Sequence, residues 1–392
     1  MATISSAIPL TGVPFPRSEY ERRQLKVLEA VSSARLDALV VSAHGHLRYL
    51  SGYDGSGGYF APFPLILVPG RPPTYVVREY DEHAVRAYCC IDDIVTYTHQ
   101  PDFGTVCADV FRRLGLQSKR IGFELGCWNL APTDVRAIQA QLPDLKISDA
   151  SWLVSSVAAV KGELELQCMR DAMRMTDLAV RTFQSSLRVG VTELEMAETI
   201  AAAIKADVSN TGGEVGLAPA ATILFGERTK LPHGPATHHA ISNNEPAFLE
   251  IGASKYGYAA GMVRCAVLGR HPETESLHAL AEEVIETLVA VIRPGTTAAE
   301  VDAAGREVLK RSGRKGVFRQ RTGYLTGIHW TERGNLSLEP GAKDVLSAGM
   351  TLHMPNILRS ENGYLIGAGA HVLVTERGAE VLSSIPHTLH HA

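Results

Sequence analysis

The chain has 392 residues, of which 45% are hydrophobic and 20% charged, and its formal net charge is −4. This composition is typical of a globular protein, and the length is sufficient for two domains that each have a core. The weak charge, without a dense basic run, argues against nucleic acid as a partner. No stretch approaches the roughly 18 uninterrupted apolar residues of a membrane span, so we expect no membrane partner either.

Cysteine usage and the N-terminus both indicate the cytoplasm. The six cysteines show neither a C-x-x-C motif nor a zinc-type spacing, and the adjacent Cys89 and Cys90 are poorly placed to bridge each other. Residues 1–23 lack the charged segment and long apolar core of a signal peptide. We therefore expect free thiols in a reducing compartment. Residues 387–392 contain three histidines and are predicted to be a disordered tail.

The first 150 residues alternate between helical and strand patterns. Ser18, followed three residues later by Glu21, has the pattern of a capping box for the first helix. In chain order, helices are predicted over residues 18–35, 81–88, 105–115 and 132–142, and strands over 36–41, 64–68, 74–78, 119–124 and 145–148. This alternation predicts an α/β domain over residues 1–158, with a boundary near 157–162.

The remainder of the chain, residues 159–392, has a different pattern. A long helix packed on one side begins at Glu163, and a second helix over 191–208 begins with Thr192 and Glu195 as a capping box. Strands are predicted near 220–225, 246–251, 258–268, 350–358 and 363–375, and helices over about 275–291 and 297–312. Helices outside a curved antiparallel sheet form the predicted architecture, so the chain as a whole is predicted to be α+β.

The stretch from Ala247 to Gly269 reads as strand, turn and strand, with turn residues over 252–257. Its first strand carries one carboxylate, Glu250, among apolar neighbours. Such a residue is either an edge residue that faces water, which is the more frequent case, or a buried acid held for chemistry. The residues alone leave both readings open.

This stretch resembles the creatinase/methionine aminopeptidase superfamily, whose fold is called pita-bread and which includes Xaa-Pro dipeptidases. Its metalloenzymes carry one Asp in the first strand and another eleven residues later, and both bind a pair of divalent metal ions. The aligned residues here are Glu250 and Gly261. The resemblance implies a creatinase-type α/β domain over 1–158 and a pita-bread catalytic domain over 159–392.

The other metal-ligand positions of the superfamily also differ in this chain. The metal-binding His aligns with Tyr324, one Glu falls on or beside Met354, and the last Glu falls near Gly369. Gly, Tyr and Met do not supply the oxygen or imidazole ligands that a hard cation needs. The resemblance is therefore to a metal-free branch, and we predict neither a metal ion nor another cofactor.

Three residues are predicted to be catalytic. His233 lies in a loop constrained by Pro232 and Gly234. A loop histidine is more often a surface residue, but the resemblance to creatinases implies that this one transfers protons, which imidazole does near neutral pH. Glu250 could attack an electrophilic carbon or activate water as a base, and the sequence does not decide between these roles. His353 is either a third catalytic group or a core histidine.

The remaining candidates are predicted to contact the substrate. Arg333 lies roughly where creatinase has its arginine for the substrate carboxylate, a group that guanidinium binds well. Arg264 is a second candidate anchor, although a structural role is the more frequent one. Tyr324 and His329 would line the pocket. Asp54, in the sequence Ser-Gly-Tyr-Asp-Gly, would reach a partner subunit's pocket if the superfamily's homodimer is kept.

Within the superfamily, the chain most resembles ectoine hydrolases, in short pieces spread over nearly its whole length. These pieces are YLSGYDG, FLEIG, residues 321–324, 336–338 and 349–353, together with Arg264. The acidic residues of the last ectoine hydrolase strand are missing near Gly367 and Ala370, which would weaken recognition of a cationic ring. We therefore predict a metal-independent C–N hydrolase for a small amidine, guanidino or cyclic amide substrate. The alternatives are an Xaa-Pro peptidase-like metallohydrolase and a non-catalytic binding protein.

Overall fold

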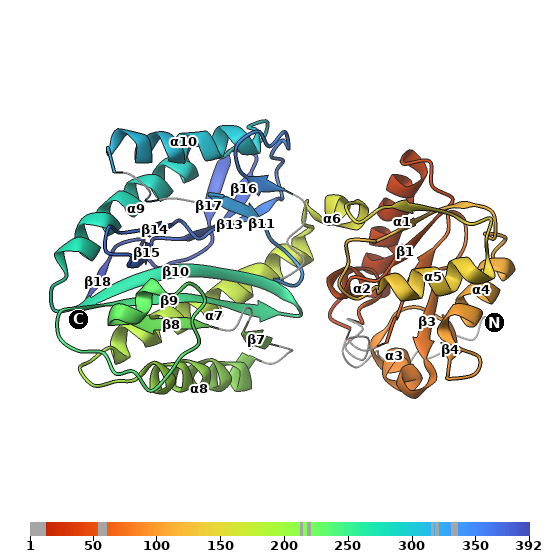
Figure 1. Cartoon of the computed structure of the whole chain (residues 1–392), viewed down its shortest axis with the longest axis horizontal. Helices are drawn as coiled ribbons and strands as arrows, with labels where there is room; N and C mark the ends of the chain where they lie inside the picture. Colours follow the sequence, from red (N-terminus) through yellow and green to blue (C-terminus); the bar gives the residue numbers. More distant parts are fainter. Residues whose placement is uncertain are drawn as a thin grey trace, which may run out of the picture. The chain divides into compact units, whose positions relative to one another are not determined.

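A computed structural model of the chain describes residues 13–53, 61–211, 215–217, 221–314, 317, 321–330 and 336–392. The candidate residues Asp54 and Arg333 lie outside these ranges. The contacts divide the chain into two compact units, residues 1–158 and residues 159–392, which are drawn in Figure 1. In the described parts, no helix has both the length and the apolar character needed to cross a membrane. All six cysteines carry free thiols.

The first unit is built on a mixed six-stranded sheet in the order β4-β3-β2-β1-β5-β6. Its strands are β1 (Ala38–Val41), β2 (Leu65–Leu67), β3 (Thr74–Arg78), β4 (Asp93–Tyr97), β5 (Arg120–Phe123) and β6 (Lys146–Asp149). Its α-helices are α1 (Arg17–Ser33), α2 (His44–Ser51), α3 (Glu82–Tyr88), α4 (Phe103–Arg113), α5 (Pro132–Gln141) and α6 (Leu153–Ala158). Helices α4 and α5 pack against the sheet through an apolar core that includes Phe111, Phe123 and Ile138.

The predicted start of the first helix is wrong by a short distance. Helix α1 begins at Arg17 after Pro16, which makes no side-chain cap, so Ser18 lies inside the first turn. The nearby carboxylate Glu19 instead binds Arg22 and Arg23 on the same helix face. The pattern of Ser18 and Glu21 therefore located a helix terminus but not its cap.

The second unit contains two larger sheets, in the orders β18-β10-β9-β7, with β8 also paired to β9, and β12-β11-β13-β16-β17. Its α-helices are α7 (Glu163–Ser186), α8 (Glu193–Thr211), α9 (Pro272–Val291) and α10 (Ala298–Arg311). The strands of the first sheet are β7 (Val215–Leu217), β8 (Thr222–Phe225), β9 (Glu245–Lys255), β10 (Tyr258–Leu268) and β18 (His390–His391). The other strands are β11 (Gly323–Leu325), β12 (Ser337–Leu338), β13 (Thr351–Met354), β14 (Ile357–Arg359), β15 (Leu365–Gly367), β16 (Ala370–Thr375) and β17 (Gly378–Val381).

A long hairpin of β9 and β10 is the centre of the second unit. Its strands pair from Lys255 and Tyr258 to Glu245 and Leu268. The turn is only Tyr256 and Gly257, which both have positive φ, 51° and 82°, as a two-residue type I′ turn requires. The predicted six-residue turn over 252–257 is therefore wrong, because these two residues reverse the chain and the strands continue up to them.

Alternating residues of the hairpin enter two different cores. Leu249, Ile251 and Met262 pack with α7 and α8. Phe248, Val263 and Cys265 enter the other core, with α9, α10 and the second sheet. Figure 1 shows the hairpin between these two groups of elements. Glu250 and Gly261 alternate with Leu249 and Met262, so they face the second sheet.

The C-terminal residues do not form the predicted disordered tail. Strand β18 adds to the edge of β10, where Ala266 and Val267 pair with His390 and His391. The Ala392 N–H donates to Val267 O at 3.0 Å, and the Gly269 N–H donates to Ala392 O at 3.0 Å. The tail is ordered because it satisfies backbone groups that β10 would otherwise leave unpaired at a sheet edge.

Candidate active site

Glu250 lies in the middle of a sheet rather than at its edge. It is opposite Thr222 of β8 on one side and opposite Val263 of β10 on the other. Residues 246–253 of β9 are otherwise buried, and Glu250 alone among them is half-buried. Gly252 is opposite Gly261, so Glu250 and Gly261 are diagonal neighbours on one face of the hairpin. The hairpin therefore presents both aligned positions toward the same space.

The space above Gly261 is occupied by an aromatic ring. A Cβ atom built on Gly261 would lie 2.9 Å from the Cη2 atom of Trp330 and 2.7 Å from the carbonyl oxygen of Ile251. Real Cβ atoms do not approach other atoms so closely. A carboxylate side chain at this position would therefore require the indole and the neighbouring strand to move.

Tyr324, His353 and His371 form a row across three adjacent strands of the second sheet. Tyr324 of β11 is opposite His353 of β13, which is opposite His371 of β16. The ring centroids of Tyr324 and His353 are 5.4 Å apart, and those of His353 and His371 are 5.7 Å apart. Trp330 packs on His353 with centroids 4.8 Å apart. These buried rings fill the region between the hairpin and the second sheet.

The residues at the remaining ligand positions do not fit a metal pair. Met354 is fully buried, and a Cβ atom on Gly369 would lie 2.9 Å from the Val263 nitrogen. No group of three or more His, Cys, Asp or Glu side chains in the described ranges could hold a metal ion. Glu250 alone among the five aligned positions offers a carboxylate, and one carboxylate does not complete the shell of a divalent ion.

Arg264 has a structural position, so the predicted contact of its side chain with a substrate is wrong. Its side chain is fully buried. Nη1 donates to Val263 O at 2.8 Å and Gly369 O at 2.6 Å, and Nη2 donates to Ile385 O at 2.9 Å. Burial lowers the pKa of the guanidinium to about 10. Arg264 therefore ties the hairpin to the segment at Gly369 and to the C-terminal segment, and it has no surface for a substrate.

His233 lies on an exposed loop with a left-handed backbone, φ 55°. Residues other than glycine seldom adopt this conformation, so surrounding contacts must hold the loop in place. His233 and Glu250 come from different elements, a loop before β9 and the middle of β9.

The contacts that hold the His233 loop converge on one buried carboxylate, Glu193, at the start of α8. Glu193 accepts hydrogen bonds from the Phe225 N–H at 3.0 Å and from Arg228 Nε at 2.9 Å. It also accepts from both the N–H and the hydroxyl of Thr237, at 2.9 Å each. Glu193 therefore fixes both ends of the loop that carries His233.

The last described candidate of the second unit, His329, lies two residues after Gly327 and has a φ of 55°. Its N–H donates to Gly257 O at 2.7 Å, at the turn of the hairpin. The ring is half-buried. His329 is therefore placed beside the hairpin turn, next to Trp330 in the sequence.

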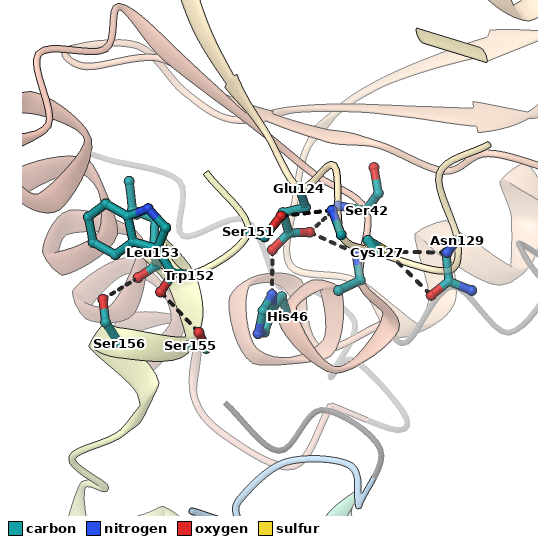
Figure 2. A network of polar contacts seen from close by, with 12 residues as sticks. Ser42, His46, Glu124, Cys127, Asn129, Ser151, Trp152, Leu153, Ser155 and Ser156 are labelled. Carbon is teal, nitrogen blue, oxygen red and sulfur yellow. Dashed lines mark hydrogen bonds and ion pairs between the residues drawn. The ribbon is translucent and has the colours of Figure 1, made fainter. Parts of the chain in front are cut away.

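In the first unit, helix α2 ends within the motif Ser51-Gly52-Tyr53, and Ser51 is its last residue. Gly52 ends the helix in a left-handed conformation, φ 87°. The helix start is held by the buried carboxylate of Glu124, which accepts from the Ser42 and Ala43 N–H groups at 2.6 and 2.8 Å and contacts His46 Nδ1 (Figure 2). A carboxylate at a helix N-terminus satisfies free N–H groups and complements the helix dipole.

Four structural supports were not predicted from the sequence: Trp330, His371, Glu193 and Glu124. For two of them, the sequence contains a pattern that could have identified the residue. Glu193 lies beside the predicted capping box, in which Thr192 and Glu195 do bind each other. His371 stands in the otherwise continuous apolar run of residues 370–374 in a predicted strand, which is the pattern of a strand buried on both faces. The partners of Trp330 and Glu124 lie far away in the sequence, so no local pattern reveals them.

Comparisons with known proteins give a consistent assignment. Residues 167–376 match the model of the metallopeptidase family M24, and residues 23–160 match that of the creatinase/prolidase N-terminal domain. The ectoine hydrolase of Halomonas elongata is 27% identical over 399 residues, covering 96% of this chain and 98% of that protein. An uncharacterized hydrolase/peptidase of Sinorhizobium fredii is 28% identical over 395 residues, with 96% and 98% coverage.

Solved structures support the fold. The prolidase of Thermococcus sibiricus superposes with a TM-score of 0.85 at 19% identity, covering 95% of this chain and 99% of that chain. The Xaa-Pro dipeptidase of Bacillus anthracis superposes with a TM-score of 0.81 at 19% identity, covering 95% and 100%. The predicted α+β architecture, with a creatinase-type first domain and a pita-bread second domain, is confirmed.

Proposed function

Because the chain belongs to the metallopeptidase family M24, we propose that it is a hydrolase that cleaves a non-peptide C–N bond without a metal ion. The substrate class is a small amidine, guanidino or cyclic amide compound. The observation that carries this proposal is that Glu250 is a carboxylate, whereas the four other aligned ligand positions are not. These four are Gly261, Tyr324, Met354 and Gly369. The acid is kept on the central strand, while Trp330 occupies the space of the second carboxylate.

The proposed chemistry adds water across the electrophilic carbon of the substrate. Oxygen bonds to that carbon, the C–N bond breaks, and the leaving nitrogen takes up a proton. Glu250 would act either by attacking the carbon itself, with water releasing it afterwards, or by removing a proton from the attacking water. His233, on its constrained loop, would give the proton to the leaving nitrogen.

The substrate class is supported by the surroundings of Glu250, a half-buried carboxylate whose diagonal neighbour Gly261 is covered by the indole of Trp330. Such a site suits a planar cation or a polar ring, because aromatic faces and a carboxylate both attract positive charge. The ectoine hydrolase of Halomonas elongata acts, by its name, on a compound of this class. It aligns with this chain over nearly the full length of both proteins. Ectoine itself is one member of the proposed class.

Xaa-Pro dipeptide hydrolysis is the second candidate, since the superposed structures are prolidases and Xaa-Pro dipeptidases. It requires metal ions that the residues at Gly261, Tyr324, Met354 and Gly369 do not bind. A third candidate, a binding protein without turnover, requires that Glu250 and His233 have no chemical role.

One assay separates these candidates. The purified protein, treated with a chelator, is tested on cyclic amidines, guanidino acids and Xaa-Pro dipeptides, with and without added Mn²⁺. We expect amidine or guanidino hydrolysis that persists in the chelator and falls by about 10³-fold in Glu250→Gln. Glu380→Gln, which changes a partly exposed carboxylate of β17 that pairs with Arg170, serves as the control. Activity that needs Mn²⁺, or no turnover of any compound, rejects the proposal.

The proposal also includes a homodimer in which Asp54 or Tyr53 reaches the partner's substrate, and Arg333 as carboxylate anchor. Mixing two inactive variants, Glu250→Gln and Asp54→Ala, tests the first part. Heterodimers would regain one intact site if each site takes residues from both subunits. Unchanged inactivity of the mixture would contradict the shared site.

A further inference from the structure

His371 lies at the centre of the candidate site. Neither the sequence analysis nor the comparisons with relatives give it a role. It is fully buried. It lies on β16 directly opposite His353, in the row of rings described above. It is two residues beyond Gly369, where the superfamily carries a metal ligand.

Both ring nitrogens of His371 have defined partners. Nδ1 accepts a hydrogen bond from the N–H of Gly261 at 3.2 Å, and Nε2 is 2.9 Å from Thr326 Oγ1. Because Nδ1 uses its lone pair, the ring proton must be on Nε2, which donates to the threonine hydroxyl. The hydroxyl proton can then point to Thr351 O at 3.4 Å. The network is therefore directional.

The two partners belong to the two walls of the site. Gly261 is on the hairpin and is the diagonal neighbour of Glu250. Thr326 begins the segment Thr326–Trp330, which is also tied to the hairpin where the Ala259 N–H donates to Gly327 O at 3.0 Å. This segment ends at the indole that covers Gly261.

We propose that His371 is a positioning residue, which sets the separation between Gly261 and Thr326 and thereby seats Trp330 over the hairpin beside Glu250. The family resemblance implies that a pair of metal ions joins the corresponding strands in the superfamily's metalloenzymes. Here one neutral imidazole joins β10, β16 and the segment after β11 through two hydrogen bonds.

The protonation behaviour of His371 is consistent with this arrangement. Burial, with Lys161 nearby, lowers its pKa to about 3. A second ring proton on Nδ1 would also point at the N–H of Gly261. The ring therefore keeps its tautomer across the neutral range, and its two bonds persist.

The test uses the fluorescence of Trp330. The chain has three tryptophans, and Trp128 is fully exposed and Trp152 48% exposed, whereas Trp330 is 7% exposed. In the full chain with Trp128→Phe and Trp152→Phe, Trp330 is the sole reporter. We expect His371→Phe and Thr326→Val each to shift its emission to longer wavelength and to increase quenching by acrylamide.

Matched variants separate positioning from general destabilisation. Thr326→Ser keeps the hydroxyl and should keep the parent signal. His278→Asn changes another buried histidine of the same unit, on α9, and should leave Trp330 unaffected. If His371→Phe does not fold, Thr326→Val decides, because it removes a single hydroxyl. Unchanged emission and quenching in Thr326→Val overturn the proposal.

The kinetic consequence rests on the proposed function. With a substrate in hand, Thr326→Val should lower kcat by about 10²-fold through misplacement of the site walls, with a smaller effect on KM. Trp330 fluorescence needs no substrate. A fluorescence response in a protein that turns over nothing would therefore reject the proposed function and leave the positioning role standing.

Discussion

Trp330 packs edge-on against His353, with ring centroids 4.8 Å apart and planes at 63°. The same indole lies over Gly261 of the hairpin. One aromatic side chain thus contacts both sheets of the second unit. In the described residues, ring packing joins the hairpin to the second sheet at this place.

Gly261→Ala tests this close packing. The added Cβ would meet Trp330 at 2.9 Å and Ile251 O at 2.7 Å, so we expect a loss of about 1–3 kcal/mol from overpacking. Combining it with Trp330→Phe should recover only part of that loss, because the carbonyl contact remains. Urea unfolding of the two single variants and the double variant measures this. If Gly261→Ala left the unfolding free energy unchanged, the space around residue 261 would not require a glycine.

The stability of the second unit should fall in acid through His278. Burial, Arg264 and His391 lower the pKa of His278 to about 4, although Glu282 Oε1 is only 2.8 Å from its Nδ1. The contact with Glu282 does not have hydrogen-bond geometry, so the loss of hydration on burial has the larger effect on the pKa of His278. The unfolded chain, with a histidine pKa near 6.5, takes up the proton first, so stability is full above about pH 6.5 and is lost as the pH falls toward 4.

His278→Gln should therefore remove roughly 3 kcal/mol of the acid-induced loss between about pH 6.5 and 4. Unfolding free energies of both proteins over this range give the comparison. His99→Gln, at an exposed position of the first unit, is the control and should leave the slope unchanged. Parallel pH profiles of His278→Gln and the parent protein would contradict the assignment.

Arg264→Met should destabilise the second unit by about 3 kcal/mol or more, because Gly369 O and Ile385 O would lose a buried donor. The C-terminal strand should also loosen, so the Gly269 and Ala392 amides should exchange hydrogen faster. Arg293→Met, at an exposed arginine, is the matched control. Unchanged exchange at the C-terminus would mean that Arg264 does not fasten this segment.

Glu193→Gln should loosen the loop that carries His233. A neutral amide has one acceptor oxygen, whereas the carboxylate accepts from Arg228, Thr237 and Phe225. We expect a loss of about 3 kcal/mol, as for other broken buried pairs, and faster hydrogen exchange over residues 231–238. Glu198→Gln, an exposed acid on the same helix, is the comparison. If Glu198→Gln had the same effects on stability and hydrogen exchange as Glu193→Gln, Glu193 would have no specific role in holding this loop.

The amino-acid sequence by itself determined the order of the elements, the two-domain division and the superfamily. Hydrophobic periodicity and capping residues are local, so they located α7, the cap of α8 and strand β10 from neighbouring residues alone. It also showed that Glu250 keeps a carboxylate where Gly261 has lost one, since that comparison needs only the spacing of the two positions.

The tertiary structure alone decided what occupies the altered site. Trp330 reaches Gly261, and His371 joins Gly261 to Thr326, across separations of 69, 110 and 45 residues in the chain. Arg264 became a structural tie, and the histidine-rich tail became an edge strand, because both satisfy distant backbone groups. Such contacts arise from the packing of whole sheets, and no pattern along a single segment encodes them.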